Sequence, residues 1–295
     1  MIISAKPFVK WAGGKGSLLS VLDSRLPTDF SAQQNITYIE PFVGGGAMLF
    51  HMLATHLNIR RVVINDINKD LIRCYQLVKD NPQKLIDLLL PVEQRFLKLN
   101  EDERRCFFYE VRNDYNNTKL TADERAAYFF FLNRTCFNGL YRENANGGFN
   151  VPFGCYKNPK ICNVDVIMED HKILSKVVIM CGDYKKVLPR LGKGYNFVYL
   201  DPPYRPLLGS ANFKQYSKSG FGDQEQEELK AFCDKLDDNG CKWMLSNSDS
   251  TNNDGTSYFQ TLYEEYSCER ILAPRFIGAN ADQRKKQTEV LIMNY

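Results

Sequence analysis

The sequence lacks a strong excess of charge of either sign. Its 295 residues carry 38 Lys and Arg against 35 Asp and Glu, which leaves a formal net charge of +3. Charge at this level does not by itself indicate a nucleic-acid partner, so any contact with a polyanion has to come from a local group of basic residues. The composition, 44% hydrophobic and 25% charged, is typical of a globular chain with one or two domains.

Long apolar segments are also missing. A helix needs ~20 predominantly apolar residues to span a membrane, and residues 126–132 are already among the longest apolar runs. Residues 1–10 lack the apolar centre of a signal peptide. These absences predict a cytoplasmic protein without a membrane span.

Paired cysteines are missing too. The nine cysteines are an odd number, and none of them forms a Cys-x-x-Cys pair. This argues against a disulfide framework and against a structural zinc site. We expect reduced, mostly buried thiols and no bound metal at the nine positions, Cys74, Cys106, Cys136, Cys155, Cys162, Cys181, Cys233, Cys241 and Cys268.

Three short apolar runs have the form of buried parallel strands. They cover residues 37–39, 61–64 and 195–200, and each stops at a polar or Gly/Pro turn. Ligand-binding residues collect just beyond the carboxyl ends of such strands. Residues 242–246 and 288–293 have the form of two further strands.

Between the second and third runs the pattern changes to helices. Apolar residues recur at helical spacing from residue 66 to about residue 110. Thr121 and Glu124 have the spacing of a capping box, which predicts a helix over residues 125–132. A polar loop rich in Gly, Asn and Arg follows over residues 133–159.

After this loop the strand and helix alternation returns, with a helix predicted over residues 224–236. The fold class is therefore α/β, with a Rossmann-like sheet that carries an inserted, mainly helical domain. We place the catalytic domain at residues 1–68 plus 158–295 and the inserted recognition domain at residues 69–157.

Residues 40–50 form a glycine-rich turn between a strand and a helix. Glycine accepts positive φ and lets the backbone approach a ligand closely, although an ordinary structural turn has the same composition. A dinucleotide fingerprint would need glycine at positions 44, 46 and 49, and the third of these is Leu49. The turn also lacks the Gly-Lys-Ser/Thr of a P-loop. A nicotinamide dehydrogenase is therefore the weaker alternative.

Asp66 follows the glycine turn by about 20 residues and ends the next predicted strand. In nucleotide-binding α/β folds an acidic residue at this place binds ribose hydroxyls. A turn without a phosphate-binding signature, followed by this acid, suits a nucleoside ligand that has no phosphates. S-adenosylmethionine (AdoMet) is such a ligand.

A second glycine-rich segment covers residues 10–15 and contains Trp11, one of only two tryptophans. A flexible N-terminal arm is one interpretation of this segment. In the functional interpretation Lys15 pairs with the carboxylate of the ligand, and Trp11 packs near its cationic sulfonium.

The tetrad Asp201-Pro202-Pro203-Tyr204 directly follows a predicted strand. The prolines fix φ and would hold Asp201 and Tyr204 rigidly at the edge of the sheet. An adenine amino group is a poor nucleophile because its lone pair is delocalised into the ring. Asp201 and the Pro202 carbonyl can accept its two protons in hydrogen bonds, which localises the lone pair, and Tyr204 offers a face for stacking the base. An ordinary turn is the alternative.

Together these residues resemble the Dam-type (D12 class) site-specific DNA adenine methyltransferases, whose motifs occur here in the family's order along nearly the whole chain. The resemblance is carried by residues 10–15, 40–46, 65–68, 109–112, 131–142, 147–154 and 201–204.

The resemblance implies transfer of a methyl group from AdoMet to the N6 amino group of an adenine that is flipped out of double-stranded DNA. No metal and no covalent intermediate are required. It implies catalytic roles for Asp201, Pro202, Pro203 and Tyr204, and AdoMet contacts at Trp11, Lys15, Phe42, Gly44, Gly46, Asp66, Asp183, Tyr184 and Asp201.

The resemblance also implies DNA contacts in the loop after residue 133. Phe137 or Asn138 would fill the gap left by the flipped adenine. Arg142 would pair with the major-groove edge of a guanine, with a phosphate contact as the alternative. Further expected DNA contacts are Arg134, Pro152 and Tyr156, and Arg275, Arg284, Lys285 and Lys286 are expected to bind phosphates.

Residues 153–159 resemble the family members that recognise GATC, although relatives that recognise GATATC share the Phe-Asn-Gly at residues 137–139. The sequence departs from the family in two places. Cys155 stands where the family usually has a basic residue, and residues 277–280 differ from the commoner pattern. Both departures bear on fine specificity and not on the reaction.

Two other functions remain as alternatives. A methyltransferase of the same fold could act on RNA or on a protein glutamine, but such enzymes more often carry Asn at the first tetrad position and lack this insertion. A DNA-binding module without catalysis would need neither Asp201 nor the glycine turn. The sequence leaves open whether a restriction endonuclease acts on the same site. We expect a monomer.

Overall fold

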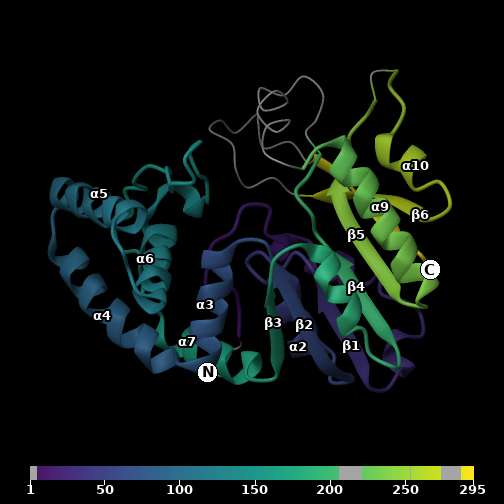
Figure 1. Ribbon diagram of the computed structural model, residues 1–295, viewed down its shortest axis with the longest axis horizontal. Helices are drawn as coiled ribbons and strands as arrows, with labels where there is room; N and C mark the ends of the chain where they lie inside the picture. Colours follow the sequence, from purple (N-terminus) through teal and green to yellow (C-terminus); the bar gives the residue numbers. More distant parts are fainter. Residues whose placement is uncertain (1–4, 206–220, 253, 274–286) are drawn as a thin grey trace. The chain divides into compact units, whose positions relative to one another are not determined.

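The computed structural model describes residues 5–205, 221–252, 254–273 and 287–295. The chain divides into two compact units (Figure 1). Unit 1 comprises Met1–Gly16, Val43–Leu57 and Ile64–Asp183, and unit 2 comprises Ser17–Phe42, Asn58–Val63 and Tyr184–Tyr295. The predicted insertion over residues 69–157 lies within unit 1, and its boundaries stay a prediction.

Within the described residues, seven strands form one sheet in the order β3-β2-β1-β4-β5-β7-β6. β1 runs parallel to β4 and β4 runs parallel to β5, whereas β7 is antiparallel to both β5 and β6. The mixed sheet and its helices confirm the predicted α/β class. The strands are β1 (Ile36–Glu40), β2 (Ile59–Asp66), β3 (Val177–Cys181), β4 (Asn196–Leu200), β5 (Lys242–Ser248), β6 (Ser267–Ala273) and β7 (Gln287–Met293).

The parallel strands β1 and β4 are buried along their whole length, as expected for strands covered on both faces. Ile39 of β1 pairs with Val198 of β4. Because the two strands run in the same direction, the residues after Glu40 and after Leu200 leave from the same edge of the sheet. This edge therefore receives the tetrad that begins at Asp201.

The helices of unit 1 pack around α6, which contacts α3, α4 and α5 (Figure 1). Residues 129–132 of α6 are all buried, because a helix that is apolar on every side needs neighbours all around it. The capping box predicted at Thr121 and Glu124 is present, so this prediction is confirmed. The helices are α2 (Ala47–Thr55), α3 (Lys69–Asp80), α4 (Pro82–Lys98), α5 (Glu101–Asn117), α6 (Ala122–Thr135) and α7 (Val164–Leu174).

In unit 2, α9 (Asp223–Asp238) packs against β5 (Figure 1) and confirms the helix predicted over residues 224–236. None of the described helices has the length and apolarity needed to cross a membrane. All nine cysteines are free, and five of them are buried. The other helical segments of the described residues are α1 (Leu19–Asp23) and α10 (Tyr258–Leu262), with 3-10 turns at Lys15–Ser17, Phe30–Ala32, Phe137–Gly139 and Tyr184–Arg190.

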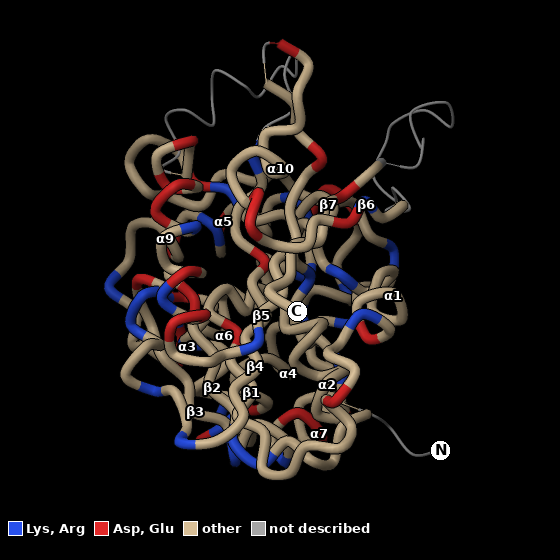
Figure 2. Tube along the Cα trace, turned by 90° about the vertical axis from the view of Figure 1, so that its right-hand side faces the viewer, with Lys and Arg blue, Asp and Glu red and all other residues tan. Residues whose placement is uncertain are grey.

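Basic and acidic residues are interspersed over the described chain (Figure 2). This agrees with the small net charge of +3. A binding site for a polyanion must therefore be found among local clusters of Lys and Arg.

Candidate functional site

The glycine turn owes its composition first to its own packing. Gly44 and Gly46 have φ of 48° and 75°, a left-handed conformation that favours glycine. A Cβ on Gly44 would lie 2.9 Å from Cδ1 of Trp11, and a Cβ on Gly46 would collide with the hydroxyl of Tyr75. The Tyr75 hydroxyl also donates to the Gly44 carbonyl at 3.1 Å. The turn is thus a tightly fixed backbone, and this explains part of the sequence pattern without a ligand.

Asp66 lies at the carboxyl end of β2 and binds this turn directly. Its Oδ2 accepts a hydrogen bond from the Gly44 backbone N–H at 3.0 Å, and its Oδ1 accepts one from the Asn68 N–H at 2.9 Å. Burial raises the pKa of the Asp66 carboxyl above its usual value, although these backbone hydrogen bonds oppose the shift. Each oxygen keeps a lone pair that can accept a bond from a ligand hydroxyl.

Ile67, the residue after Asp66, is a candidate ligand contact that the sequence analysis did not identify. Ile67 is 75% exposed, although it directly follows a buried strand. A large apolar side chain held in solvent beside a carboxylate can cover one face of a flat ring. Its place in the Asn-Asp-Ile-Asn motif was the available signal.

Trp11 is packed between the glycine turn and Tyr141. Its indole would collide with a Cβ on Gly44, and its own Cβ would lie 3.0 Å from a Cβ on Gly45. On the Tyr141 ring it stacks with a centroid distance of 5.6 Å and an interplanar angle of 18°. Tyr141 immediately precedes Arg142, so the aromatic pair joins the predicted cofactor turn to the predicted DNA-binding loop within unit 1.

The segment that carries Trp11 is not a loose arm. The side chain of Asn133 on α6 holds the main chain of Lys10 twice: its Oδ1 accepts from the Lys10 N–H at 2.8 Å, and its Nδ2 donates to the Lys10 carbonyl at 2.7 Å. Farther back, the Lys6 N–H donates to Asp170 at 3.0 Å. Lys15 is only 4% exposed, and its ammonium donates to the Gly13 carbonyl at 3.0 Å. These bonds disfavour the flexible-arm interpretation for residues 6–15.

The tetrad begins at the carboxyl end of β4, in unit 2. The Ser246 hydroxyl donates to Oδ1 of Asp201 at 3.2 Å, and Tyr199 lies 3.0 Å from the same hydroxyl. The Pro203 carbonyl accepts from the side chain of Gln226 at 3.2 Å. Among the described residues, none donates a hydrogen bond to the Pro202 carbonyl. The tetrad therefore presents a carboxylate and a carbonyl from adjacent residues as acceptors.

Tyr204 is anchored at its hydroxyl, which donates to Oε2 of Glu289 at 2.7 Å. Burial, together with the charges of Asp201 and Glu289, raises the pKa of Tyr204 well above its usual value. The phenol therefore stays neutral at physiological pH. A neutral ring with a fixed hydroxyl has a defined face for stacking.

Two further predicted cofactor residues come together in unit 2. The rings of Phe42 and Tyr184 lie 5.1 Å apart, centroid to centroid. Tyr184 is buried and also meets Phe232 edge to face at 5.0 Å. Asp183 directly precedes Tyr184 in the chain and is exposed. Packing alone accounts for much of the Tyr184 environment.

The loop after α6 presents Phe137 and Asn138 to solvent. Phe137 is 50% exposed, and its backbone N–H donates to the Pro152 carbonyl at 2.8 Å. Asn138 has φ of 53°, so the chain turns sharply at this point. A Cβ on Gly139, the next residue, would collide with the Lys10 side chain. The two residues predicted to enter the DNA thus form the tip of a tightly packed turn.

Arg142 is exposed but held in place. Its Nε donates to the side-chain oxygen of Asn150 at 2.6 Å, and its Nη2 donates to the Asn150 carbonyl at 3.3 Å. The remaining N–H groups of the guanidinium are directed by this clamp. An arginine oriented in advance loses less conformational entropy when it binds a planar pair of acceptors.

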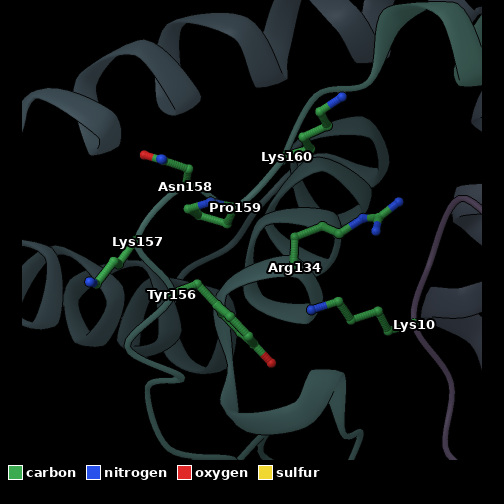
Figure 3. A pocket seen from close by; sticks show the side chains of 7 residues that line it. All are labelled: Lys10, Arg134, Tyr156, Lys157, Asn158, Pro159 and Lys160. Atoms are coloured by element: carbon green, nitrogen blue, oxygen red, sulfur yellow. The ribbon is translucent and has the colours of Figure 1, made fainter.

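Arg134 and Tyr156, two predicted DNA contacts, line one pocket of about 270 Å³ together with Lys10, Lys157, Asn158, Pro159 and Lys160 (Figure 3). The Lys10 ammonium lies 4.1 Å from the centre of the Tyr156 ring. Burial and the nearby Arg134 guanidinium lower the pKa of Lys10, and burial lowers the pKa of Arg134. The pocket gathers positive charge and suits an anion. The sequence analysis did not identify its three lysines as binding residues. Lys10 and Lys157 lie in the motifs at residues 10–15 and 153–159, and Lys160 directly follows the second motif.

The basic residues predicted to bind phosphates near the C-terminus, Arg275, Arg284, Lys285 and Lys286, lie outside the described residues, as does the departure at residues 277–280. Among the described residues, no group of three His, Cys, Asp or Glu side chains has the arrangement of a metal site.

Known proteins support the resemblance along the whole chain. A type II methyltransferase of Methanocaldococcus jannaschii, M.MjaIII, is 44% identical over 296 residues, covering 99% of this chain and 100% of its own length. M1.LlaDCHI of Lactococcus lactis subsp. cremoris, also a type II methyltransferase, is 36% identical, with 99% and 96% coverage. A DNA adenine methylase of Vibrio cholerae is 32% identical, with 98% and 95% coverage.

Among solved structures, an rRNA methyltransferase of Streptomyces viridochromogenes aligns over 94% of this chain and 83% of its own. Its identity of 11% and TM-score of 0.38 support no argument about function. The model of the D12 class N6 adenine-specific DNA methyltransferases matches residues 11–275. With relatives above 30% identity over nearly the full length, the chain belongs to the D12 class of N6 adenine-specific DNA methyltransferases.

Proposed function

We propose that this chain transfers a methyl group from AdoMet to N6 of an adenine flipped out of duplex DNA, within the sequence GATC. The observation that carries the proposal is the pair of acceptors at Asp201 and Pro202. Two acceptors on adjacent residues match the two protons of an exocyclic amino group. Neither an ordinary turn nor a DNA-binding module without catalysis requires such a pair.

The residues of unit 1 fit the chemistry of AdoMet, the methyl donor implied by the family. Asp66 offers carboxylate oxygens to ribose hydroxyls, and the exposed side chain of Ile67 offers apolar surface to an adenine ring. Trp11 and Lys15 are assigned to the sulfonium and carboxylate end, and Gly44 allows close approach of the backbone. The bound cofactor supplies an electrophilic methyl group on a positively charged sulfur.

The tetrad prepares the nucleophile. Asp201 and the Pro202 carbonyl each accept one proton of the adenine amino group in a hydrogen bond, which draws the nitrogen lone pair out of the ring. The hydrogen bond from the Ser246 hydroxyl fixes the orientation of the Asp201 carboxylate. Tyr204 stacks on the base. As the N6–carbon bond forms, the methyl carbon would give up its bond to the donor sulfur, which would leave as a neutral thioether. The Asp201 carboxylate stabilises the positive charge that develops on nitrogen, and this strongly acidic nitrogen then loses its extra proton to water.

Recognition of the site is assigned to the loop of unit 1. Phe137 or Asn138, at the tip of its turn, fills the space from which adenine is extruded. Arg142, clamped by Asn150, reads a guanine through two hydrogen bonds. The cluster around Arg134 and Tyr156 binds the DNA backbone. The choice of GATC rests on the resemblance of residues 153–159 to family members that recognise it.

The test is transfer of tritiated methyl groups from AdoMet to matched substrates. We expect incorporation into a duplex with one GATC site, and little into duplexes in which one base of the site is changed. A duplex with GATATC tests the nearest alternative sequence, and an RNA duplex and a glutamine-containing peptide test the other substrate classes. Preferred methylation of either of these last two would overturn the proposal.

A variant links this activity to the tetrad. Asp201→Ala should abolish methyl transfer while duplex binding, followed by fluorescence anisotropy, stays within about threefold of the wild type, since phosphate contacts dominate affinity. Asp201→Asn is the matched control for shape, and it should also be strongly impaired because an amide accepts less well. Activity near that of the wild type in Asp201→Ala would refute the assignment.

A further inference from the structure

Two consecutive arginines on α5 have opposite environments. The Arg104 guanidinium is bound by four main-chain carbonyls. It donates to Phe96 at 3.0 Å and Leu97 at 2.8 Å near the end of α4, and to Lys157 at 2.7 Å and Tyr156 at 3.4 Å in the recognition loop. Arg104 therefore fastens the loop to the helices, and four of its five N–H donors are used in doing so.

Arg105, the next residue, keeps its charge available. It is exposed, and within the described part of the chain it makes no ion pair. Its Nη2 donates to the Cys155 thiol at 3.7 Å, and the guanidinium carbon lies 5.6 Å from the centre of the Phe153 ring. Sulfur is a weak acceptor, so these contacts orient the guanidinium without neutralising it. Glu101, one turn earlier on α5, does not pair with it.

The position of Arg105 bears on the departure noted at Cys155. Cys155 adopts φ of 51° and is exposed. It lines a second pocket, of about 220 Å³, with Arg104, Phe153, Tyr156 and Lys157 among the other lining residues. The loop itself carries no basic side chain at position 155, yet a guanidinium from α5 reaches that place.

We propose that Arg105 is a phosphate-binding residue of the DNA interface, which supplies from helix α5 the positive charge that the loop lacks at Cys155. The assignment rests on the proposed function, because it needs duplex DNA to lie against this loop. Phosphate contacts set affinity and register but carry no base information. Removing Arg105 should therefore weaken cognate and non-cognate binding alike.

The experiment measures duplex affinity against salt concentration by fluorescence anisotropy. Each phosphate contact contributes about −0.9 to the slope of log K against log salt. Arg105→Ala should make the slope less negative by about that amount. Between 50 and 200 mM salt, the factor by which affinity falls should then be about 3.5 times smaller for the variant than for the wild type. The thermal midpoint should change little, since Arg105 is exposed and its contact with the buried Phe153 ring is a distant one, at 5.6 Å.

Three further variants make the result specific. Arg60→Ala removes an exposed arginine of β2 and the same net charge, and it should leave the slope unchanged. Arg104→Ala should lower the thermal midpoint, which separates the two neighbouring roles. Cys155→Arg placed on the Arg105→Ala background should restore the slope, because it returns a cation to the same place from the loop.

The outcomes distinguish this assignment from the proposed function. If the wild type neither binds nor methylates duplex DNA, the proposed function itself fails. If the wild type does both and Arg105→Ala keeps the wild-type slope, the Arg105 assignment is wrong. A failure of Cys155→Arg to restore the slope, with folding intact, would also count against it.

Discussion

Replacing Asp70 by Asn should loosen the helical core that carries the recognition loop. Asp70 lies on α3 and is 8% exposed. Its two oxygens accept from Nε and Nη2 of Arg125 on α6 at 2.8 and 2.9 Å, and from the Tyr115 hydroxyl on α5 at 2.5 Å. One carboxylate thus joins three helices. Asn at this site would lose the charge and would turn an N–H toward one of these donors.

The expected loss in the free energy of unfolding depends on how the Arg125 charge is left after Asp70 is replaced. Removing one partner of a buried ion pair costs about 3–5 kcal/mol, because the other charge stays buried without compensation. The Arg125 side chain is 29% exposed, against 11% for Asp70, so water can reach part of the guanidinium. We therefore expect the lower end of that range, about 3 kcal/mol. Such a loss is a large part of the stability of an ordinary domain.

Urea unfolding of both proteins at pH 7, followed by circular dichroism, measures this difference. The pH dependence provides a second test. Burial alone would raise the pKa of Asp70, but the hydrogen bonds from Arg125 and Tyr115 outweigh it and hold the pKa below its usual value. The stabilisation is then fully present above the unfolded-state value of about 3.9 and disappears as the pH falls through the folded-state value.

The penalty of Asp70→Asn should accordingly shrink in strong acid. Asp123→Asn is a matched control, because Asp123 is half-buried in the first turn of α6 and takes no part in the cluster. A cost below about 1 kcal/mol for Asp70→Asn, in the range of surface pairs, would show that the cluster does not hold the helices together.

Three further changes probe the site. Ser246→Ala should lower kcat roughly tenfold or more with little effect on DNA affinity, because a hydrogen bond to a charged group contributes about 1.5–3 kcal/mol; an equal loss of affinity would point to misfolding instead. Arg142→Ala should cost about 1–3 kcal/mol of discrimination at one guanine, measured as kcat/KM on GATC against single-base variants; unchanged discrimination would remove its role as a reader. Tyr141→Ala should raise the Kd for AdoMet roughly twofold to tenfold in calorimetry, since an aromatic pair contributes about 0.5–1.5 kcal/mol; Tyr141→Phe, which keeps the ring against Trp11, should stay near the wild type.

The sequence predicts those elements whose signal is local. β1 and β4 are short buried runs that end at turns, and their burial on both faces leaves an uninterrupted apolar pattern. The capping box at Thr121 and Glu124 is visible because its two residues satisfy each other's backbone groups over one helical turn. The order in which the glycine turn, Asp66 and the tetrad follow one another along the chain can also be read directly from the sequence.

Features that depend on distant partners could not be predicted in this way. The direction of β7 follows from its pairing with β5 and β6, and β6 mixes polar and apolar residues as an edge strand does. Trp11 and Tyr141 are far apart in the chain, so no spacing rule connects them. The basic pocket likewise combines Lys10 with Arg134 and Lys157, which three separate segments supply. Tertiary packing determines these three features, and the local sequence pattern contains no information about them.

The side chain of Asn133 binds residue 10 only through the main-chain N–H and carbonyl of that residue. The path of the backbone at this point is therefore independent of which side chain position 10 carries. Substitutions there can add, remove or reshape a charge beside Arg134 and Tyr156 without shifting the neighbouring Trp11. Substitution of residue 10, in nature or by design, can therefore change the charge and shape of the basic pocket while Trp11 keeps its place against the glycine turn.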